Sequence, residues 1–295
     1  MVRLANLEAT ICRTKEIPML SRTRGSASSF GRYLSLSHLL LASLLSLPLA
    51  SVSTTAAANT PAAPTAIDVD VLVTGAVDQT RGLSSYAEMS MLIKRPSWQR
   101  KSALKAWTRG REDALIRFVA PTRDAGNALL KQGERMWTYT PKLNKSIRLP
   151  GGMMSQSWAG SDFSYNDMSR SDKWLRQYSL EHVATERHDG MAVYVIDAIP
   201  KEDAAVVWGK EQLRIRADLV LLELAYFDQD MQPVRLMRSL EVGELGGRMM
   251  ATRMRMQELD KPDQYTELEY LDMDFDIDVP ERTFTLFSLQ SGRNR

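Results

Sequence analysis

Cysteine and histidine are scarce in this sequence. Its 295 residues include a single cysteine, Cys12, and three histidines. Cys12 lies in a leader that we expect to be removed, which would leave no thiol for a disulfide, a metal site, a nucleophile or a lipid anchor. His182 and His188 would remain, and neither belongs to an HExxH motif or to another metal-ligand spacing. These absences argue against a disulfide scaffold and against zinc chemistry.

Motifs of nucleophilic catalysis and of phosphate binding are also missing. The sequence contains no GxSxG elbow, no Walker loop and no GxGxxG turn. An acid/base pair of Asp162 and Asp167, or hydrolysis by Ser161 or Asp162, is the catalytic alternative. Acidic residues in loops more often serve as turn and cap groups, and Ser164 with Asp167 fits an S-x-x-D helix cap. We therefore expect a protein that is not an enzyme and that needs no cofactor and no metal.

The amino-terminal segment has the layout of a secretory signal. Arg22, Arg24 and Arg32 precede the apolar run 39–50, and small residues follow through Ala58. The run of about twelve residues is shorter than the roughly 20 that a membrane-spanning helix needs. We expect residues 1–58 to be a cleaved signal peptide, with either Met1 or Met19 as the true start, and the mature protein to be periplasmic, without a stable membrane anchor. Residues 59–66 would form a flexible tether and residues 67–295 a single β domain.

Removal of the signal reverses the net charge. The whole chain carries +2, and residues 1–58 hold six basic and two acidic residues, so the remainder carries 2 − 4 = −2. Binding to nucleic acid requires a concentrated positive surface. The charge therefore argues against a nucleic-acid partner.

Alternation of apolar and polar residues dominates from residue 86 onward. In residues 86–95 and 270–278, apolar side chains occupy every second position, and similar segments follow one another at short intervals. Asp228 to Gln232 would form the turn of a hairpin before Pro233. Residues 68–82 are ambiguous, because Asp68 could cap a short helix while Val69, Val71 and Val73 also fit a strand. The pattern predicts a mainly β protein with an antiparallel sheet and a few short helices.

Methionine is abundant, with fourteen of the sixteen residues lying after residue 58. Methionine fills irregular apolar space and also suits adaptable binding surfaces. On strand faces such as Met250, Met254 and Met256, both roles remain open.

Several motifs together resemble a known family. The segments 136–152, 160–168 (GSDFSYNDM), 225–235 and 253–270, followed by the closing TFTLFSLQ, are similar in order to outer-membrane lipoprotein-sorting proteins of the LolA-like type. The resemblance implies a strongly curved, open half-barrel sheet with a helical and loop lid over an apolar concavity. It also implies a carrier that shields acyl chains of lipids or lipoproteins and works with an inner-membrane transporter of the resistance-nodulation-division or ABC type.

Combined with strand parity, the resemblance predicts a set of cavity residues. These are Met89, Met91, Ile93, Ile116, Phe118, Trp137, Tyr139, Met250, Met254, Met256, Leu271, Met273 and Phe275. A one-residue bulge would reverse any of these assignments. A rim, lid or partner-docking loop would contain Gly160, Ser161, Asp162, Phe163 and Tyr165. The alternative function is an envelope sensor or regulatory module with the same fold that binds a membrane protein.

Overall fold

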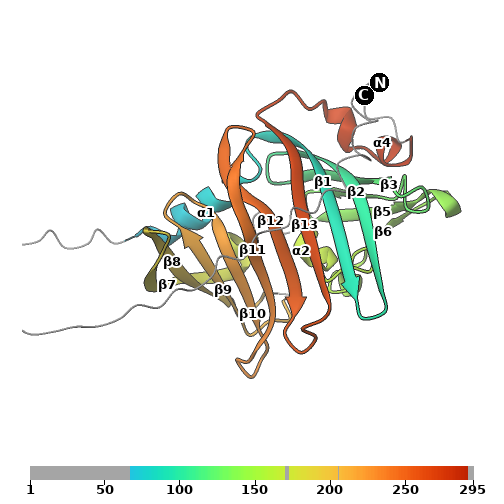
Figure 1. Ribbon diagram of the computed structural model, residues 1–295. Coiled ribbons are helices and arrows are strands. Elements are labelled where there is room, and N and C mark those ends of the chain that lie inside the picture. Colours follow the sequence, from blue (N-terminus) through green and yellow to red (C-terminus); the bar gives the residue numbers. More distant parts are fainter. Residues whose placement is uncertain (1–66, 170–172, 205, 292–295) are drawn as a thin grey trace, which may run out of the picture. The chain divides into compact units, whose positions relative to one another are not determined.

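One large antiparallel sheet organises the chain (Figure 1). The computed structural model describes residues 67–169, 173–204 and 206–291. Within these residues, thirteen strands form a single sheet in the order β6-β5-β4-β3-β2-β1-β13-β12-β11-β10-β9-β8-β7. The edge strands β6 and β7 do not pair with each other, so the curved sheet stays open. The expected signal peptide and tether lie outside the described residues.

The strands are connected mostly by short turns, as the tandem alternating segments predicted. In the first half they are β1 (Ser84–Arg95), β2 (Trp98–Arg109), β3 (Asp113–Ala120), β4 (Ala128–Gln132), β5 (Arg135–Thr140) and β6 (Lys145–Arg148). In the second half they are β7 (Tyr178–His188), β8 (Met191–Pro200), β9 (Lys210–Arg216), β10 (Leu221–Phe227), β11 (Pro233–Leu245), β12 (Arg248–Glu258) and β13 (Tyr265–Phe275).

The helices are short. They are α1 (Val69–Gln79), α2 (Tyr165–Met168), α3 (Lys173–Gln177) and α4 (Leu286–Ser291), with the 3-10 turns η2 (Pro141–Leu143), η3 (Gly151–Met153) and η4 (Glu281–Phe284). Among the described residues, no helix has both the length and the apolar composition that crossing a bilayer requires.

The sheet is a meander interrupted by one long crossing. The chain forms β1 to β6 outward to one edge, crosses to β7 at the other edge, and returns by hairpins until β13 pairs with β1. The segment before α3, residues 149–169, begins this crossing, and we call it the crossover segment. Trp158 and Phe163 of this segment are buried in the main core. The face of the sheet covered by α1 and the crossover segment is called the inner face below.

A second, smaller core lies on the outer face. Strand alternation in β3 shows the division, because Ile116 and Phe118 belong to the main core while Leu115 belongs to the second. Phe284 of η4 and Leu289 of α4 cover this second cluster. The guanidinium of Arg117, also on the outer face, donates from Nη2 to the carbonyl oxygens of Ser288 (2.8 Å) and Leu289 (3.3 Å). A cation at the last turn stabilises a helix terminus, and here it holds α4 against the sheet.

Two local predictions are decided by side-chain oxygens. Asp68 Oδ1 accepts a hydrogen bond from the Val71 amide (3.1 Å), which caps α1 and favours the helix over the strand. Leu72, Val73 and Ala76 form its buried face, at helical spacing. The hairpin turn after β10 is confirmed, because Asp228 Oδ1 accepts from the Gln232 amide (2.9 Å) just before β11 begins.

Candidate functional site

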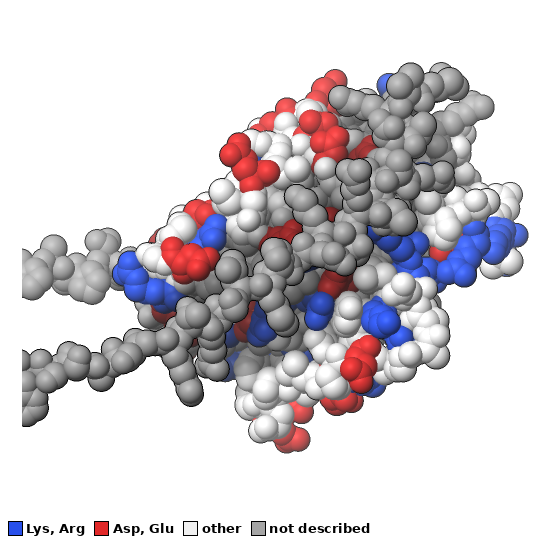
Figure 2. Space-filling view, viewed as in Figure 1, with Lys and Arg blue, Asp and Glu red and all other residues white. Residues whose placement is uncertain are grey.

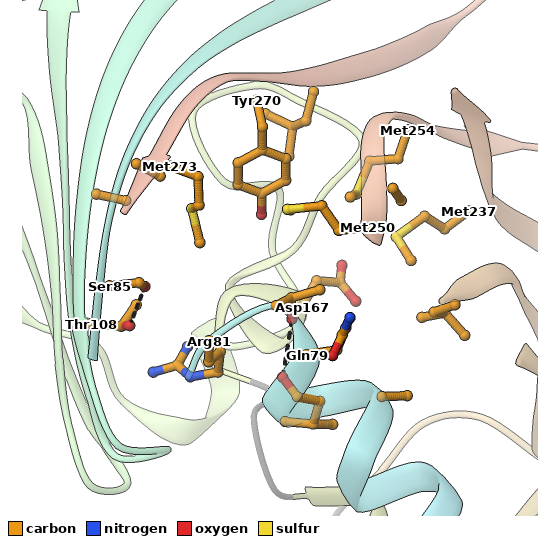
Figure 3. A pocket seen from close by; sticks show the side chains of 18 of the residues that line it. Gln79, Arg81, Ser85, Thr108, Asp167, Met237, Met250, Met254, Tyr270 and Met273 are labelled. Atoms are coloured by element: carbon orange, nitrogen blue, oxygen red, sulfur yellow. Dashed lines mark hydrogen bonds between the residues drawn. The ribbon is translucent and has the colours of Figure 1, made fainter. Parts of the chain in front are cut away.

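An apolar cavity lies between α1 and the inner face of the sheet (Figure 3). Its volume is about 290 Å³. Helix α1 contributes Val73, Ala76 and Val77 to one wall, and strands from both halves of the sheet contribute the rest. Trp158 and Met168 of the crossover segment also line it. Helix α1 thus acts as a cover over a hollow that the sheet and the crossover segment do not fill.

Methionine is the commonest side chain on the cavity wall. Six of the fourteen methionines that follow residue 58 line the cavity: Met89, Met168, Met237, Met250, Met254 and Met273. Figure 3 shows Met237, Met250, Met254 and Met273 around the same space. Flexible, polarizable side chains can adapt to an apolar guest of variable shape.

The structure divides the thirteen predicted cavity residues into groups. Five line the cavity: Met89, Ile116, Met250, Met254 and Met273. Four are buried in the same core but do not line the cavity: Met91, Ile93, Phe118 and Met256. One reason is visible at Phe118, whose ring centroid lies 5.6 Å from that of Trp158. At that position the crossover segment occupies the inner face.

The other four residues differ from the prediction for local reasons. Trp137 and Tyr139 of β5 point to the outer face and contact the second core. Met136, on the same strand, points the other way and belongs to the main core. Phe275 is partly buried beneath the guanidinium of Arg248, 4.2 Å from its ring centroid. Leu271 is 44% exposed.

A bulge explains Leu271. In the pairing of β1 with β13, Glu88 faces Asp272 and Met89 faces Tyr270, so Leu271 is the extra residue. Tyr270 and Met273 therefore share the cavity although strict alternation would separate them. Bulges carry no strong local sequence signal, so parity alone could not place Leu271.

Sequence reasoning missed several lining residues. Met237 of β11 and Leu268 and Tyr270 of β13 line the cavity, as do the α1 side chains. The signal for α1 was present as apolar residues at helical spacing, Leu72, Val73 and Ala76, but the valine alternation competed with it.

The polar side chains of the cavity wall have hydrogen-bond partners within the protein, with one exception. Ser85 Oγ and Thr108 Oγ1 are 2.6 Å apart and share a hydrogen bond. Gln79 Nε2 donates to the Met249 carbonyl (2.9 Å), and Arg81 Nη2 donates to the carbonyl of Gly110 (3.0 Å). The remaining ones, Thr80, Asp167 and Trp174, also have partners.

Tyr270 is the exception. Its hydroxyl points into the cavity in Figure 3 and makes no hydrogen bond within the described part of the chain. Burial raises the pKa of Tyr270 above its ordinary value of 10.0, against a smaller lowering by the positive charge of Arg81. The phenol therefore stays protonated near neutral pH and remains a hydrogen-bond donor.

The stretch GSDFSYNDM is a structural clamp between the crossover segment and the sheet. Asp162 Oδ2 accepts from Thr266 Oγ1 of β13 (2.6 Å) and from Arg95 Nη1 of β1 (3.0 Å). The Asp162 amide donates to Thr266 Oγ1 (2.9 Å). Arg235 Nη2 of β11 donates to the Asp162 carbonyl oxygen. One aspartate thus joins three strands to the crossover segment.

Asp167 completes the clamp. Its Oδ2 atom accepts from Arg235 Nη2 (2.6 Å), and the two side chains are only 6% and 8% exposed. Asp167 Oδ1 accepts from the Tyr226 hydroxyl (3.1 Å). The predicted cap is confirmed: Ser164 Oγ accepts from the Asp167 amide while Asp167 Oδ2 accepts from the Ser164 amide (2.7 Å).

These contacts bear on the catalytic alternative. Both carboxylates are committed to arginine and hydroxyl partners. Ser161 is buried, and its hydroxyl donates to the Trp158 carbonyl (2.6 Å). Phe163 is also buried, Tyr165 is partly buried and Gly160 is exposed. The predicted rim loop therefore sits largely inside the main core.

We expect Asp68→Ala to loosen the cover of the cavity. Loss of the cap oxygen should cost about 1 kcal/mol of helix stability. Amide hydrogens of α1 should exchange faster with solvent, by about fivefold to tenfold at that energy. Hydrogen-exchange mass spectrometry on α1 measures this. Asp70→Asn, in the same helical turn, is the matched control, and equal acceleration in both variants would contradict the role of the cap.

Comparison with solved structures places this architecture in a class. The fold is that of LolA-like lipoprotein-sorting proteins. An outer membrane lipoprotein-sorting protein domain from Vibrio parahaemolyticus is 20% identical, with a TM-score of 0.66, covering 74% of this chain and 97% of the other. A DUF1329 family protein from Desulfovibrio piger is 22% identical, with a TM-score of 0.67 and coverages of 75% and 98%. A LolA superfamily protein from Nitrosomonas europaea is 20% identical, with a TM-score of 0.63 and coverages of 75% and 98%.

A family model described as "Uncharacterized protein" matches residues 110–291, more than half of the chain. The chain belongs to this family, and its fold is LolA-like. A search of curated proteins gives no match.

Proposed function

We propose that this protein is a non-catalytic periplasmic carrier that holds acyl chains of lipids or lipoproteins in the cavity under α1. The main support for this proposal is the cavity itself, which is lined by methionines and aliphatic side chains and covered by a short helix. The similarity in fold to the lipoprotein-sorting protein domain from Vibrio parahaemolyticus supports the same proposal.

The energetics explain why such a cavity is needed. Each CH₂ group transferred from a membrane into water costs about 0.8 kcal/mol. Exposing a sixteen-carbon chain to water therefore costs on the order of ten kcal/mol. A carrier must offset most of this free-energy cost by burying the chain in an apolar cavity. It must also bind the chain weakly enough to release it to the acceptor. Adaptable methionine walls give burial with little demand on shape.

The cover explains how cargo of different length could enter. Small-molecule pockets commonly measure about 300 to 1,000 Å³, and this cavity of about 290 Å³ lies at the lower limit. We infer that α1 moves outward as a longer chain enters. Its outward residue Val71 is 66% exposed, so no further layer of described residues packs over that position.

Mass spectrometry of the native protein tests the proposal. Protein purified from its own envelope should carry acyl lipid that solvent extraction releases and identifies. Lipid-free protein should also bind a fluorescent fatty-acyl probe. Protein that carries no lipid and binds no probe would overturn the carrier function. A stable complex of such lipid-free protein with a membrane protein would instead indicate a sensor or regulatory module.

The same proposal includes exchange with an inner-membrane transporter of the resistance-nodulation-division or ABC type. Transfer should then be measurable as release of the fluorescent acyl probe when the purified carrier meets transporter-containing membranes. Release at the same rate to protein-free vesicles would argue against a dedicated transporter partner.

A further inference from the structure

The hydroxyl of Tyr270 is the one wall group of the described cavity that lacks a hydrogen-bond partner. The other polar side chains on the wall are engaged by neighbours, including Arg81 on the Gly110 carbonyl and Ser85 with Thr108. Tyr270 lies between Met273 and Met250 in the view of Figure 3, with its oxygen directed toward the centre of the space. Tyr270 is partly buried, and a hydroxyl in apolar surroundings without a partner is unfavourable unless a ligand or water supplies one.

We propose that Tyr270 binds the carbonyl oxygen of the cargo's acyl group, so that the site recognises an ester- or amide-linked chain rather than plain hydrocarbon. This inference rests on the proposed carrier function and specifies its ligand. A neutral phenol donates one hydrogen bond, which a carbonyl accepts. The surrounding methionines then contact the methylene groups next to that carbonyl.

The bond orients the cargo. With the carbonyl at Tyr270, the polar part of the ligand lies between β13 and the C-terminal end of α1, where Gln79 and the following Arg81 line the cavity. The hydrocarbon extends along the methionine wall. The site therefore accepts one end of the chain in preference to the other, while the charged wall groups Arg81 and Asp167 stay engaged by their protein partners.

Tyr270→Phe tests this assignment. The probes are a long-chain fatty-acid methyl ester and an alkane with the same number of heavy atoms, each competing against a fluorescent apolar dye. One hydrogen bond to a neutral group corresponds to roughly a threefold to tenfold preference, so the native protein should prefer the ester by about that factor. Tyr270→Phe should lose the preference while its affinity for the alkane is kept or rises.

A matched control separates this role from general damage. Tyr265→Phe makes the same change near the start of β13, at a position that does not line the cavity, and it should leave the ester preference unchanged. Tyr270→Phe should unfold at a temperature no lower than that of the native protein, because the hydroxyl has no partner to lose. Retention of the ester preference in Tyr270→Phe would overturn the assignment. Binding of neither probe to the native protein would overturn the carrier function itself.

A separate observation concerns the surface around β5 and β6. Residues 135–161 contain four basic residues, Arg135, Lys142, Lys145 and Arg148, and no acidic residue. Residues 59–295 carry a net charge of −2, so the part outside this stretch carries −2 − 4 = −6. Figure 2 shows Lys and Arg gathering at the end of the molecule where β5 and β6 lie in Figure 1. We call residues 135–148 the basic hairpin.

Apolar side chains are interleaved with these charges. Leu143 in the turn is 68% exposed and Ile147 in β6 is 48% exposed. None of the four basic side chains forms an ion pair within the described part of the chain, and Arg135 only covers the ring of Trp137, 5.5 Å from its centroid. Beside the hairpin, Arg135 and Arg148 line an open cleft of about 730 Å³ that also includes Gly151 and Gly152.

The geometry points to reversible docking of the basic hairpin on a membrane surface rich in anionic phospholipids. Basic side chains near such a surface each contribute attraction, and exposed apolar residues insert at the headgroup boundary. The net negative charge of the remaining protein opposes nonspecific adsorption and orients the molecule, so that this edge of the sheet faces the bilayer. Arg135 and Arg148 on the cleft wall could pair with the phosphate of a lipid headgroup.

Vesicle co-sedimentation tests the docking surface. The protein should bind vesicles of phosphatidylcholine mixed with phosphatidylglycerol and should not bind vesicles of phosphatidylcholine alone. Lys142→Glu/Lys145→Glu should reduce binding about tenfold or more, since each basic residue contributes about 1 kcal/mol. Leu143→Ser/Ile147→Ser should weaken binding by several-fold, and salt should weaken the native interaction.

The control must change net charge equally at another place. Arg187→Glu/Lys261→Glu alters β7 at the opposite edge and the turn between β12 and β13, both exposed. Equal loss of binding in this control would show that only net charge matters and would overturn the proposal. Failure of the native protein to bind phosphatidylglycerol vesicles would do the same, without affecting the cavity.

Discussion

Met254→Glu should weaken binding of a fluorescent fatty-acyl probe by about tenfold to a hundredfold. Met254 of β12 is partly buried and lines the cavity. A carboxyl group there either stays ionised beside hydrocarbon or takes up a proton, and an unpaired polar group in such a place costs about 1 to 3 kcal/mol. Fluorescence titration measures the dissociation constant.

A neighbour on the same strand supplies the control. Met249 is 39% exposed and lies outside the cavity, so Met249→Glu adds the same group without touching the site. Its affinity should remain within about twofold of the native value, a difference of about 0.4 kcal/mol. A second variant, Ala106→Phe, fills the cavity from β2 without adding charge and should also reduce probe binding. Native affinity in both cavity variants would refute the location of the site.

Asp167→Asn should be the most destabilising of the substitutions considered. The change leaves Arg235 buried without its counter-ion and weakens the cap of α2. Removing one partner of a buried ion pair commonly costs about 3 to 5 kcal/mol. Urea unfolding should therefore show a clearly lower midpoint, and hydrogen exchange should show the largest increase in the crossover segment.

Asp274→Asn is the matched control for this experiment. Asp274 is exposed on β13, and the same removal of one negative charge should change stability by no more than about 0.5 kcal/mol. Comparable losses in both variants would indicate a general charge effect. A small loss in Asp167→Asn would show that the clamp does not hold the crossover segment.

The clamp also clarifies the relation between motif and function. GSDFSYNDM has the polar composition of an active site, yet its carboxylates bind Arg95, Thr266 and Arg235 on strands distant in sequence. The crossing between the two halves of the meander spans the inner face, and these contacts hold it there. Cavity shape therefore also depends on residues outside the cavity wall, such as Asp162.

Local sequence determined the elements of this protein. Alternation set the strands, Asp228 set a hairpin turn, and the S-x-x-D spacing set the cap of α2, because each depends on neighbours within a few residues. Alternation also separated the two faces of each strand. It could not say which face α1 would cover, so Trp137 and Tyr139 were assigned to the cavity although their side chains contact the outer core.

Only the tertiary structure decided where space remained. The crossover segment fills the space on the inner face near Phe118. Near Met89, α1 covers the inner face but leaves a cavity beneath it. The bulge at Leu271 brings Tyr270 into that cavity. The pairing of β13 with β1 joins segments about 180 residues apart, and local periodicity contains no information about such contacts. A cavity forms where packed elements leave space between them, and that space depends on contacts between distant segments. The sequence could therefore suggest apolar residues for the cavity wall but could not show which of them line it.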